Sequence, residues 1–273
     1  MRRVKLTIAY DGTAYRGFQV QPGAPTVQSA METALSRLLQ EPVRLRAAGR
    51  TDAGVHARRQ VVDFADAGRR DLETILRGGN ALLPPDIRIL SAEEAPPDFD
   101  ARRHATAKEY RYFLHLGRVA SPFLVRYAWR PGNPIDPGAL RNGLDRFAGE
   151  HDFSAFRGQG CTAKTTVRRI LRAEMIFRPP ALAVVVLVGT GFLRHMVRNI
   201  VGTLVETGRG RMSPEEIPAI LASRDRTRAG PTAPPCGLFL WRVEYGDSPF
   251  PLDADEEVGS NTFFDFDGEG LRR

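Results

Sequence analysis

Alternating apolar and polar residues predict a β-strand at the start of the chain. Val4, Leu6 and Ile8 are separated by polar side chains, which is the period of a strand with one buried face. Thr26 can then cap a helix, because apolar residues follow it at helical spacing over 27–39. The remaining patterns of this half predict strands at 43–47, 61–64 and 87–90 and a short helix near 71–77. The resulting order of elements is βαββαβ.

The second half of the chain repeats this order. A strand is expected at 108–116, and Asp136 followed by Pro137 marks a helix N-cap and the first helical residue. Later patterns predict paired strands at 167–177 and 182–188, helices over 193–206 and after Ser213, and a last strand at 237–245. Two βαββαβ units in tandem predict an α+β fold of two ferredoxin-like halves, 1–105 and 106–245, whose sheets join edge to edge. Helices on one face of such a sheet would leave the other face open to a large ligand.

The distribution of charge indicates a polyanionic partner. The chain of 273 residues has a formal net charge of +7, but its tail, residues 246–273, contains eight acidic and only two basic residues. Residues 1–245 therefore hold a surplus of thirteen positive charges. GC-rich coding explains why 36 arginines accompany only 3 lysines, but it does not explain the surplus. We expect this part of the chain to bind nucleic acid, and we assign no function to the acidic tail.

The sequence lacks the motifs of several other chemistries. Cys161 and Cys236 are isolated and the histidines are scattered, so neither a disulfide framework nor a zinc site is expected. No glycine-rich nucleotide loop occurs, so we expect an enzyme without cofactor or metal. There is no apolar run of 18 residues and no signal-peptide pattern at the start. We therefore expect a cytoplasmic protein with no membrane partner.

The stretch GRTDAGVHARR, residues 49–59, carries the strongest candidate for chemistry. Asp52 is its only carboxylate, it stands among three arginines, and a glycine on each side lets the backbone turn sharply. A carboxylate beside Arg50 is expected to be ionised, which suits a nucleophile or an electrostatic stabiliser better than a general acid. A structural ion pair or an Asx-turn would use the same residues. We expect His56 only to hydrogen-bond within this loop.

The motif KEYRY, residues 108–112, is a second candidate. On a strand, Tyr110 and Tyr112 share one face, while Glu109 and Arg111 share the other. Aromatic side chains with basic neighbours are typical of sheets on which RNA bases stack. Tyrosines are also ordinary strand formers, so the pattern fits a plain structural strand as well.

The motif GFLRHMVRNIVG, residues 191–202, is the third candidate. Its helical spacing predicts a buried stripe of Phe192, Met196, Val197 and Ile200, with Leu193 near the edge. Arg194 and Arg198 are four residues apart and are expected to share one helix face. A face of this kind is often simply exposed to solvent.

Taken in order, GRTDAGVHA, KEYRY, FLRHMVRNIVG and GLFLWRVEY resemble the motifs of the tRNA pseudouridine synthase A (TruA) family, and the resemblance extends from about Val4 to Tyr245. It implies the pseudouridine synthase fold, with a mixed, mostly antiparallel central sheet and a catalytic cleft between the halves. It implies a cofactor-free isomerisation of uridine to pseudouridine at positions 38, 39 and 40 of the tRNA anticodon stem–loop. It also implies a homodimer, with the tRNA lying across both subunits.

The resemblance further implies roles for individual residues. The family's catalytic aspartate matches Asp52, its active-site tyrosine matches Tyr110, and the arginine that pairs with the aspartate matches Arg198. Arg50 matches the arginine that helps to extrude the target base, and Leu238 matches an apolar residue of the uracil pocket. The other residues that we expect to contact RNA are Phe99, Arg102, Arg103, Arg118, Cys161 and Lys164.

The first RNA-contact segment, Phe99–Arg103, departs from the family pattern. Many members have His and Ser where this chain has Asp100 and His104. Arg102 is retained, so the departure affects the contacts expected around Asp100.

Two other classes of function are the alternatives. A glycoside hydrolase or nucleosidase would need a second carboxylate near the first, and no motif supplies one. A non-catalytic RNA-binding protein of RRM-like fold would carry an aromatic RNP1 hexapeptide, and none occurs. Within the synthase interpretation, Asp52 could attack the ribose or the base, or stabilise an oxocarbenium-like ribose.

Overall fold

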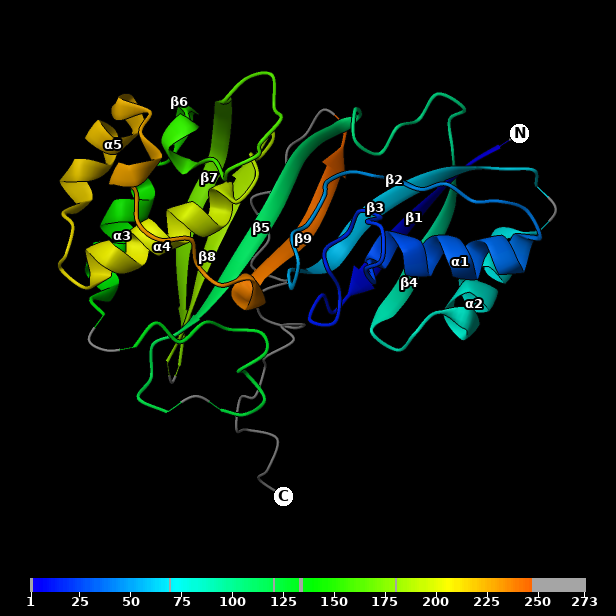
Figure 1. Ribbon diagram of the computed structural model, residues 1–273, viewed down its shortest axis with the longest axis horizontal. Coiled ribbons are helices and arrows are strands. Elements are labelled where there is room, and N and C mark those ends of the chain that lie inside the picture. The colour runs from blue at the N-terminus through cyan, green and yellow to red at the C-terminus, as the bar shows by residue number, and fades with distance from the viewer. Residues whose placement is uncertain (1, 69, 120, 133–134, 180, 247–273) are drawn as a thin grey trace.

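One nine-stranded sheet runs through the computed structural model, which describes residues 2–68, 70–119, 121–132, 135–179 and 181–246 (Figure 1). From one edge to the other, the strands are β4 (Ile87–Ala95), β1 (Arg2–Tyr10), β3 (His56–Asp66), β9 (Leu238–Tyr245), β5 (Ala105–His115), β8 (Leu182–Gly189), β7 (Val167–Arg178) and β6 (Gly149–Asp152), and β2 (Arg46–Ala47) pairs with β3. The acidic tail beyond Gly246 lies outside the described residues.

The sheet is continuous across both halves of the chain. Its strand pairs are antiparallel except for β3 and β9, which run parallel, with His56 opposite Phe239 and Ala57 opposite Leu240. This pair joins the halves, because β9 also pairs with β5. The expected mixed, mostly antiparallel sheet of an α+β fold is therefore confirmed. The boundary proposed near residue 105 stays a prediction.

The helices lie in two groups, at the right and the left of Figure 1. They are α1 (Val27–Leu39) and α2 (Leu72–Leu82) in the first half, and α3 (Pro137–Asp145), α4 (Met196–Gly208) and α5 (Ile217–Ser223) in the second. The main apolar core lies between these helices and the sheet, whereas a smaller cluster around Phe113 and Trp241 lines the opposite face. Among the described residues, no helix is both long and apolar enough to cross a membrane.

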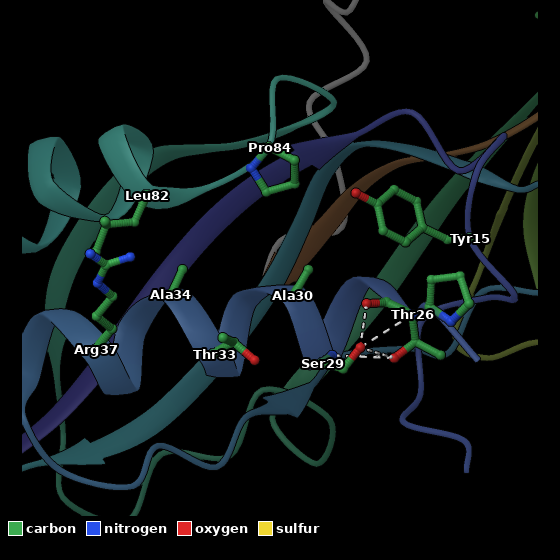
Figure 2. A pocket seen from close by; sticks show the side chains of 10 residues that line it. Tyr15, Thr26, Ser29, Ala30, Thr33, Ala34, Arg37, Leu82 and Pro84 are labelled. Atoms are coloured by element: carbon green, nitrogen blue, oxygen red, sulfur yellow. Dashed lines mark hydrogen bonds between the residues drawn. The ribbon is translucent and has the colours of Figure 1, made fainter. Parts of the chain in front are cut away.

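The helix caps expected from the sequence are present. The Thr26 hydroxyl accepts the Ser29 amide, and the Ser29 hydroxyl accepts the Thr26 amide, both at 3.2 Å (Figure 2). The Asp136 carboxylate accepts the Gly138 amide at 2.8 Å. Ser213 and Glu216 form the expected capping box, which begins a 3₁₀ turn, Pro214–Glu216, that leads into α5.

The strand expected at 43–47 is shorter than its pattern suggests. Only Arg46 and Ala47 join the sheet, because the backbone before them bonds to side chains of α1. The Leu45 amide donates to the Glu32 carboxylate at 2.9 Å, and the Val43 amide donates to the Ser36 hydroxyl at 2.9 Å. The loop between this strand and the next is also shorter than expected, since β3 begins at His56 and not near residue 61.

Two further elements differ from the sequence-based expectation. The edge strand β6 was not predicted, because its residues, GEHD, show no alternation of apolar and polar side chains. Helix α4 begins at Met196 and not near Leu193, because His195 adopts the left-handed conformation with φ 60°. Arg194 therefore lies before the helix, and the prediction that it shares a helix face with Arg198 is wrong.

The segment 226–233 packs along α4 and fixes its position. The Gly230 amide donates to the Thr203 hydroxyl at 2.9 Å, and the Ala233 amide donates to the Arg198 carbonyl at 3.1 Å. The approach is so close that a Cβ on Gly202 would overlap the carbonyl oxygen of Pro231.

Replacing Gly202 with alanine should therefore destabilise the protein by about 1–3 kcal/mol, despite the better helix propensity of alanine. Denaturant unfolding of the purified variant measures this change. Gly78→Ala in α2 is the matched control, because its Cβ would meet only the end of the Leu38 side chain, which can move. An equal effect of the two substitutions would contradict the close packing of 226–233 on α4.

Candidate active site

The loop before β3 holds Asp52 in a fixed turn. The Val55 amide donates to the Asp52 carbonyl at 3.1 Å, and Gly54 takes a positive φ of 74° that a residue with a Cβ adopts only under strain. The hydroxyl of Thr51, the residue before Asp52, is hydrogen-bonded to the Tyr10 hydroxyl at 2.8 Å inside the core. The Asp52 side chain remains 27% exposed, so the carboxylate is held by its backbone but open to a ligand.

Arg198 reaches Asp52 from the opposite half of the chain. Its Nη1 donates to Asp52 Oδ2 at 3.2 Å, and its Nε donates to the Ala233 carbonyl at 2.7 Å. Two anchors on one planar guanidinium fix the direction from which the positive charge faces the carboxylate. The structure thus brings together Asp52 and Arg198, as expected. The cation beside Asp52 is Arg198, however, and not Arg50, which is exposed and is in no ion pair among the described residues.

His195 is a member of this site that the sequence pattern did not identify. Its Nε2 lies 3.5 Å from Asp52 Oδ2, and its ring packs over Gly158, where a Cβ would come within 2.6 Å of Nδ1. Burial lowers the pKa of His195 below its usual value; the Asp52 carboxylate opposes this shift, and Arg198 and Arg194 reinforce it. The imidazole is therefore mainly neutral at pH 7. The sequence pattern did not reveal His195 as a site residue, because helical spacing cannot predict a residue in the left-handed conformation.

Tyr110 forms the apolar wall of the site. It lies on β5 and is buried, and Phe192 meets its ring edge to face at 4.8 Å between centroids. Phe192 is thus half-buried beside Tyr110 and is not part of the stripe predicted for α4, whereas Leu193 is buried. Burial raises the pKa of Tyr110, and electrostatic interactions with the neighbouring Tyr10 and with the Asp52 carboxylate raise it further, so the hydroxyl stays protonated.

Tyr112 and Leu238 lie deeper on the same face. Tyr112 is fully buried and donates to the Pro234 carbonyl at 2.7 Å, so it supports the core and cannot stack on a base. Leu238, opposite Tyr112 in the sheet, is buried as expected for a pocket residue. These residues belong to the main core on the helix side of the sheet, so the predicted site does not use the opposite face.

The segment Phe99–Arg103 presents its arginines but not its phenylalanine. Phe99 is buried against Tyr245, with ring centroids 5.2 Å apart, whereas Arg102 and Arg103 are exposed. Asp100 Oδ1 accepts the amides of both arginines, at 2.9 and 3.0 Å. Burial alone would raise the pKa of Asp100, but these amides and Arg46 hold it below its usual range. Asp100 therefore shapes the turn that presents the two arginines.

The remaining predicted RNA contacts lie on two other loops. Cys161 is half-buried and Lys164 is exposed on the loop between β6 and β7, and Arg194 Nη1 donates to the Gln159 carbonyl of this loop at 3.1 Å. This contact places the loop beside the start of α4. Arg118 is exposed on the loop after β5, and no contact among the described residues joins it to Asp52.

His56 is structural, as expected, although it lies on β3 and not in the loop. It is fully buried, its Nδ1 accepts the Gly12 amide at 3.1 Å, and its Nε2 faces the Cys236 carbonyl at 3.1 Å. Its ring stacks on Phe239 with centroids 4.6 Å apart. His56 therefore ties β3 to the chain entering β9.

Among the described residues, neither a metal-binding group nor the hollow in Figure 2 provides a second candidate for this chemistry. No group of three or more His, Cys, Asp or Glu side chains among the described residues could hold a metal ion. The hollow in Figure 2 lies between α1 and the end of α2, is lined mainly by small or apolar residues and contains no carboxylate. Neither Asp52 nor its partners Arg198 and His195 line this hollow.

Comparison with known proteins gives consistent matches over the described chain. A family model described as tRNA pseudouridine synthase matches residues 6–102 and 144–246. The chain is 48% identical over 245 residues to a tRNA pseudouridine synthase A of Pelobacter propionicus, with 90% of this chain and 100% of the relative covered. The corresponding protein of Geobacter sulfurreducens is 47% identical with the same coverage. That of Myxococcus xanthus is 44% identical over 265 residues, covering 95% of this chain and 100% of the relative.

The geometry around His195 predicts opposite pKa changes in two variants. Arg198→Met should raise the pKa of His195, because a cation that disfavours the imidazolium is removed, and Asp52→Asn should lower it, because the nearby anion is lost. Titration of the His195 ring signals by NMR, assigned with His195→Gln, measures both changes. Arg194→Met serves as the control and should raise the pKa less than Arg198→Met. Shifts of the same sign in the first two variants would exclude the arrangement described.

Proposed function

The chain belongs to the tRNA pseudouridine synthase family and is an isomerase acting on tRNA, and we propose that it converts uridine to pseudouridine at positions 38, 39 and 40 of the anticodon stem–loop. The observation that carries the proposal is the Asp52 carboxylate, anchored by Arg198 beside the buried Tyr110. A fixed carboxylate, a fixed cation and an aromatic wall suit the isomerisation of a flat, uncharged base.

The reaction requires no cofactor. The bond from the ribose C1′ to N1 of uracil breaks, the base rotates, and C1′ bonds to C5, while C5 loses its proton and N1 gains one. Atoms and electrons therefore balance within the nucleotide. Asp52 can attack the ribose or the base as a nucleophile, or stabilise the positive charge that develops on the ribose. In each case Arg198 keeps the carboxylate aimed at one point.

The target base must leave the stem before it can reach Asp52. Extrusion of a stacked base costs a few kcal/mol. Arg50 is exposed on the loop that carries Asp52, so its side chain is available to fill the space that the base leaves. The extruded uracil would then stack on Tyr110, with Leu238 at the floor of the pocket. Exposed arginines such as Arg102 and Arg103 would hold the phosphates that Asp52 alone would repel.

We also propose that the protein acts as a homodimer in the cytoplasm. The loop after β5 exposes three apolar side chains, Val119 at 84%, Phe123 at 71% and Val125 at 60%. An apolar loop of this kind is suited to burial against a second copy. A monomeric mass in sedimentation at micromolar concentration would exclude the dimer.

The first test is incubation of the protein with unmodified tRNA, followed by nucleoside analysis and mapping of the modified positions. Wild type should form pseudouridine at positions 38 to 40, and Asp52→Asn should lose roughly 10³-fold or more in rate while it keeps its tRNA affinity. The amide occupies the same space but cannot act as a nucleophile. Free uracil would indicate a hydrolase instead, and an unchanged nucleoside profile with tight binding would indicate a non-catalytic RNA-binding protein. Asp52→Asn activity within tenfold of wild type would contradict the role of Asp52.

Arg198 and Arg194 form a matched pair for the second test. Arg198→Met should slow single-turnover isomerisation by about 10²–10³-fold, because the charge that orients Asp52 is lost. Arg198→Lys should also be impaired, since a lysine cannot hold the Ala233 carbonyl and Asp52 with one planar group. Arg194→Met should cost much less, because Arg194 binds the Gln159 carbonyl and not Asp52. Equal rate losses for Arg194→Met and Arg198→Met, with unchanged melting temperatures, would refute the assignment.

A further inference from the structure

Lys108 lies in the site but has no role in the mechanism described above. It precedes Tyr110 by two residues on β5, so both side chains point to the same face of the sheet. A Cβ on Gly49 would lie 3.7 Å from Lys108 Nζ and 3.7 Å from Tyr110 Oη. The ammonium and the phenol are therefore neighbours beneath the loop that carries Arg50 and Asp52.

The Lys108 ammonium has no acceptor among the described residues. It is half-buried, and the charged groups that act on it most strongly are Arg102 from the first half and Arg168 from β7. Burial, and then these two positive charges, lower the pKa of Lys108 to about 8. Arg168 is itself held in place, because its Nη1 donates to the carbonyls of Thr165 at 3.0 Å and Val167 at 2.6 Å.

The Lys108 ammonium thus lies beside the Tyr110 hydroxyl, half-buried and with no carboxylate bound to it among the described residues, and Arg102 and Arg168 add to the positive potential that acts on it. Such an arrangement costs electrostatic free energy in the free protein, and an anion of the ligand would recover it. A lysine ammonium is a compact charge that suits phosphate oxygens. The anions of an RNA substrate are its phosphates, and the two that flank the target uridine are those closest to a base on Tyr110.

We propose that Lys108, beside Tyr110 and beneath the loop of Arg50 and Asp52, binds one of the two backbone phosphates next to the target uridine and so sets the extruded nucleotide in register with Tyr110 and Asp52. This inference rests on the proposed function, because it assigns a subsite to the same RNA ligand. Lys108 is then a positioning residue. It would position the nucleotide as it binds, whereas Asp52 and Arg198 would act on the bonds that break and form.

The test removes the charge on either partner. Anticodon stem–loop RNAs are prepared with a neutral methylphosphonate at the linkage 5′ or 3′ to the target uridine, and Kd and single-turnover rate are measured for each. With wild type, one of the two neutral linkages should weaken binding about ten- to hundredfold, the value of a hydrogen bond to a charged group. Lys108→Met should show a similar loss on the normal RNA and no further loss at that linkage.

Two further variants separate this role from a structural one. Lys108→Arg keeps the charge and should recover most of the affinity and the sensitivity to the neutral linkage. Lys5→Met is the control, because Lys5 pairs with Glu93 on the edge of the first half, and its sensitivity to both linkages should equal that of wild type. Lys108→Gln replaces Lys108→Met if thermal melting shows that the methionine variant is unfolded.

The outcomes distinguish this inference from the proposed function. If Lys108→Met loses as much affinity as wild type at each neutral linkage, the two losses are additive and the phosphate subsite is refuted. If the Lys108 substitution and the neutral linkage show the expected coupling in RNA affinity, but wild type forms no pseudouridine, the proposed function fails and the subsite stands. If neither linkage affects wild type, the subsite is also refuted.

Discussion

The ion pair between Asp52 and Arg198 is the interaction on which the candidate site depends. Its two residues are 146 positions apart and come from different halves, so it forms only when the halves are correctly placed. The Asp52 loop is fixed to the first half through Thr51 and Tyr10. Arg198 is fixed to the second half through Ala233 and the close packing of Gly202 on Pro231. The parallel pairing of β3 with β9 then sets the distance between them. A shift of any of these contacts would move the charge away from the carboxylate.

The sequence was a good guide to the fold where periodicity and capping agreed. The βαββαβ order of the first half, the Thr26 and Ser213 caps and the strand that ends at Tyr245 are all present. It failed where side chains replaced strand partners, as at Leu45, whose amide bonds to Glu32 and not to the sheet. It also could not show that β9 inserts between β3 and β5, since strand order depends on pairing between distant segments.

The candidate site was predictable only in part, for a related reason. The residue pattern singled out Asp52 and indicated the strand of Tyr110, motif resemblance assigned their roles and added Arg198 as the partner of Asp52, and the structure brings the three together. Pattern reasoning alone assigned Arg50 to Asp52, because residues close in sequence seemed the natural partners. His195 was missed, and Phe192 was wrongly assigned to the buried stripe of the helix. Both errors arose because the left-handed conformation of His195 makes α4 begin only at Met196. Lys108 was noticed only as part of a strand motif, since neither its burial nor its neighbouring cations can be seen in the sequence.

The position of β9 has a consequence for synthesis of the protein on the ribosome. The strand is among the last described segments of the chain, yet it supplies the parallel partner of β3 and the antiparallel partner of β5. The first half can form β1, β3 and β4 as soon as it emerges, but one edge of β3 lacks its partner until residue 240 has left the exit tunnel. We infer that a nascent or prematurely terminated chain that contains Arg198 but lacks β9 cannot hold Arg198 beside Asp52, because the strand that joins the two halves is missing. Incomplete products of translation would then be inactive toward RNA, and the exposed edge of β3 would mark them for chaperones or proteases.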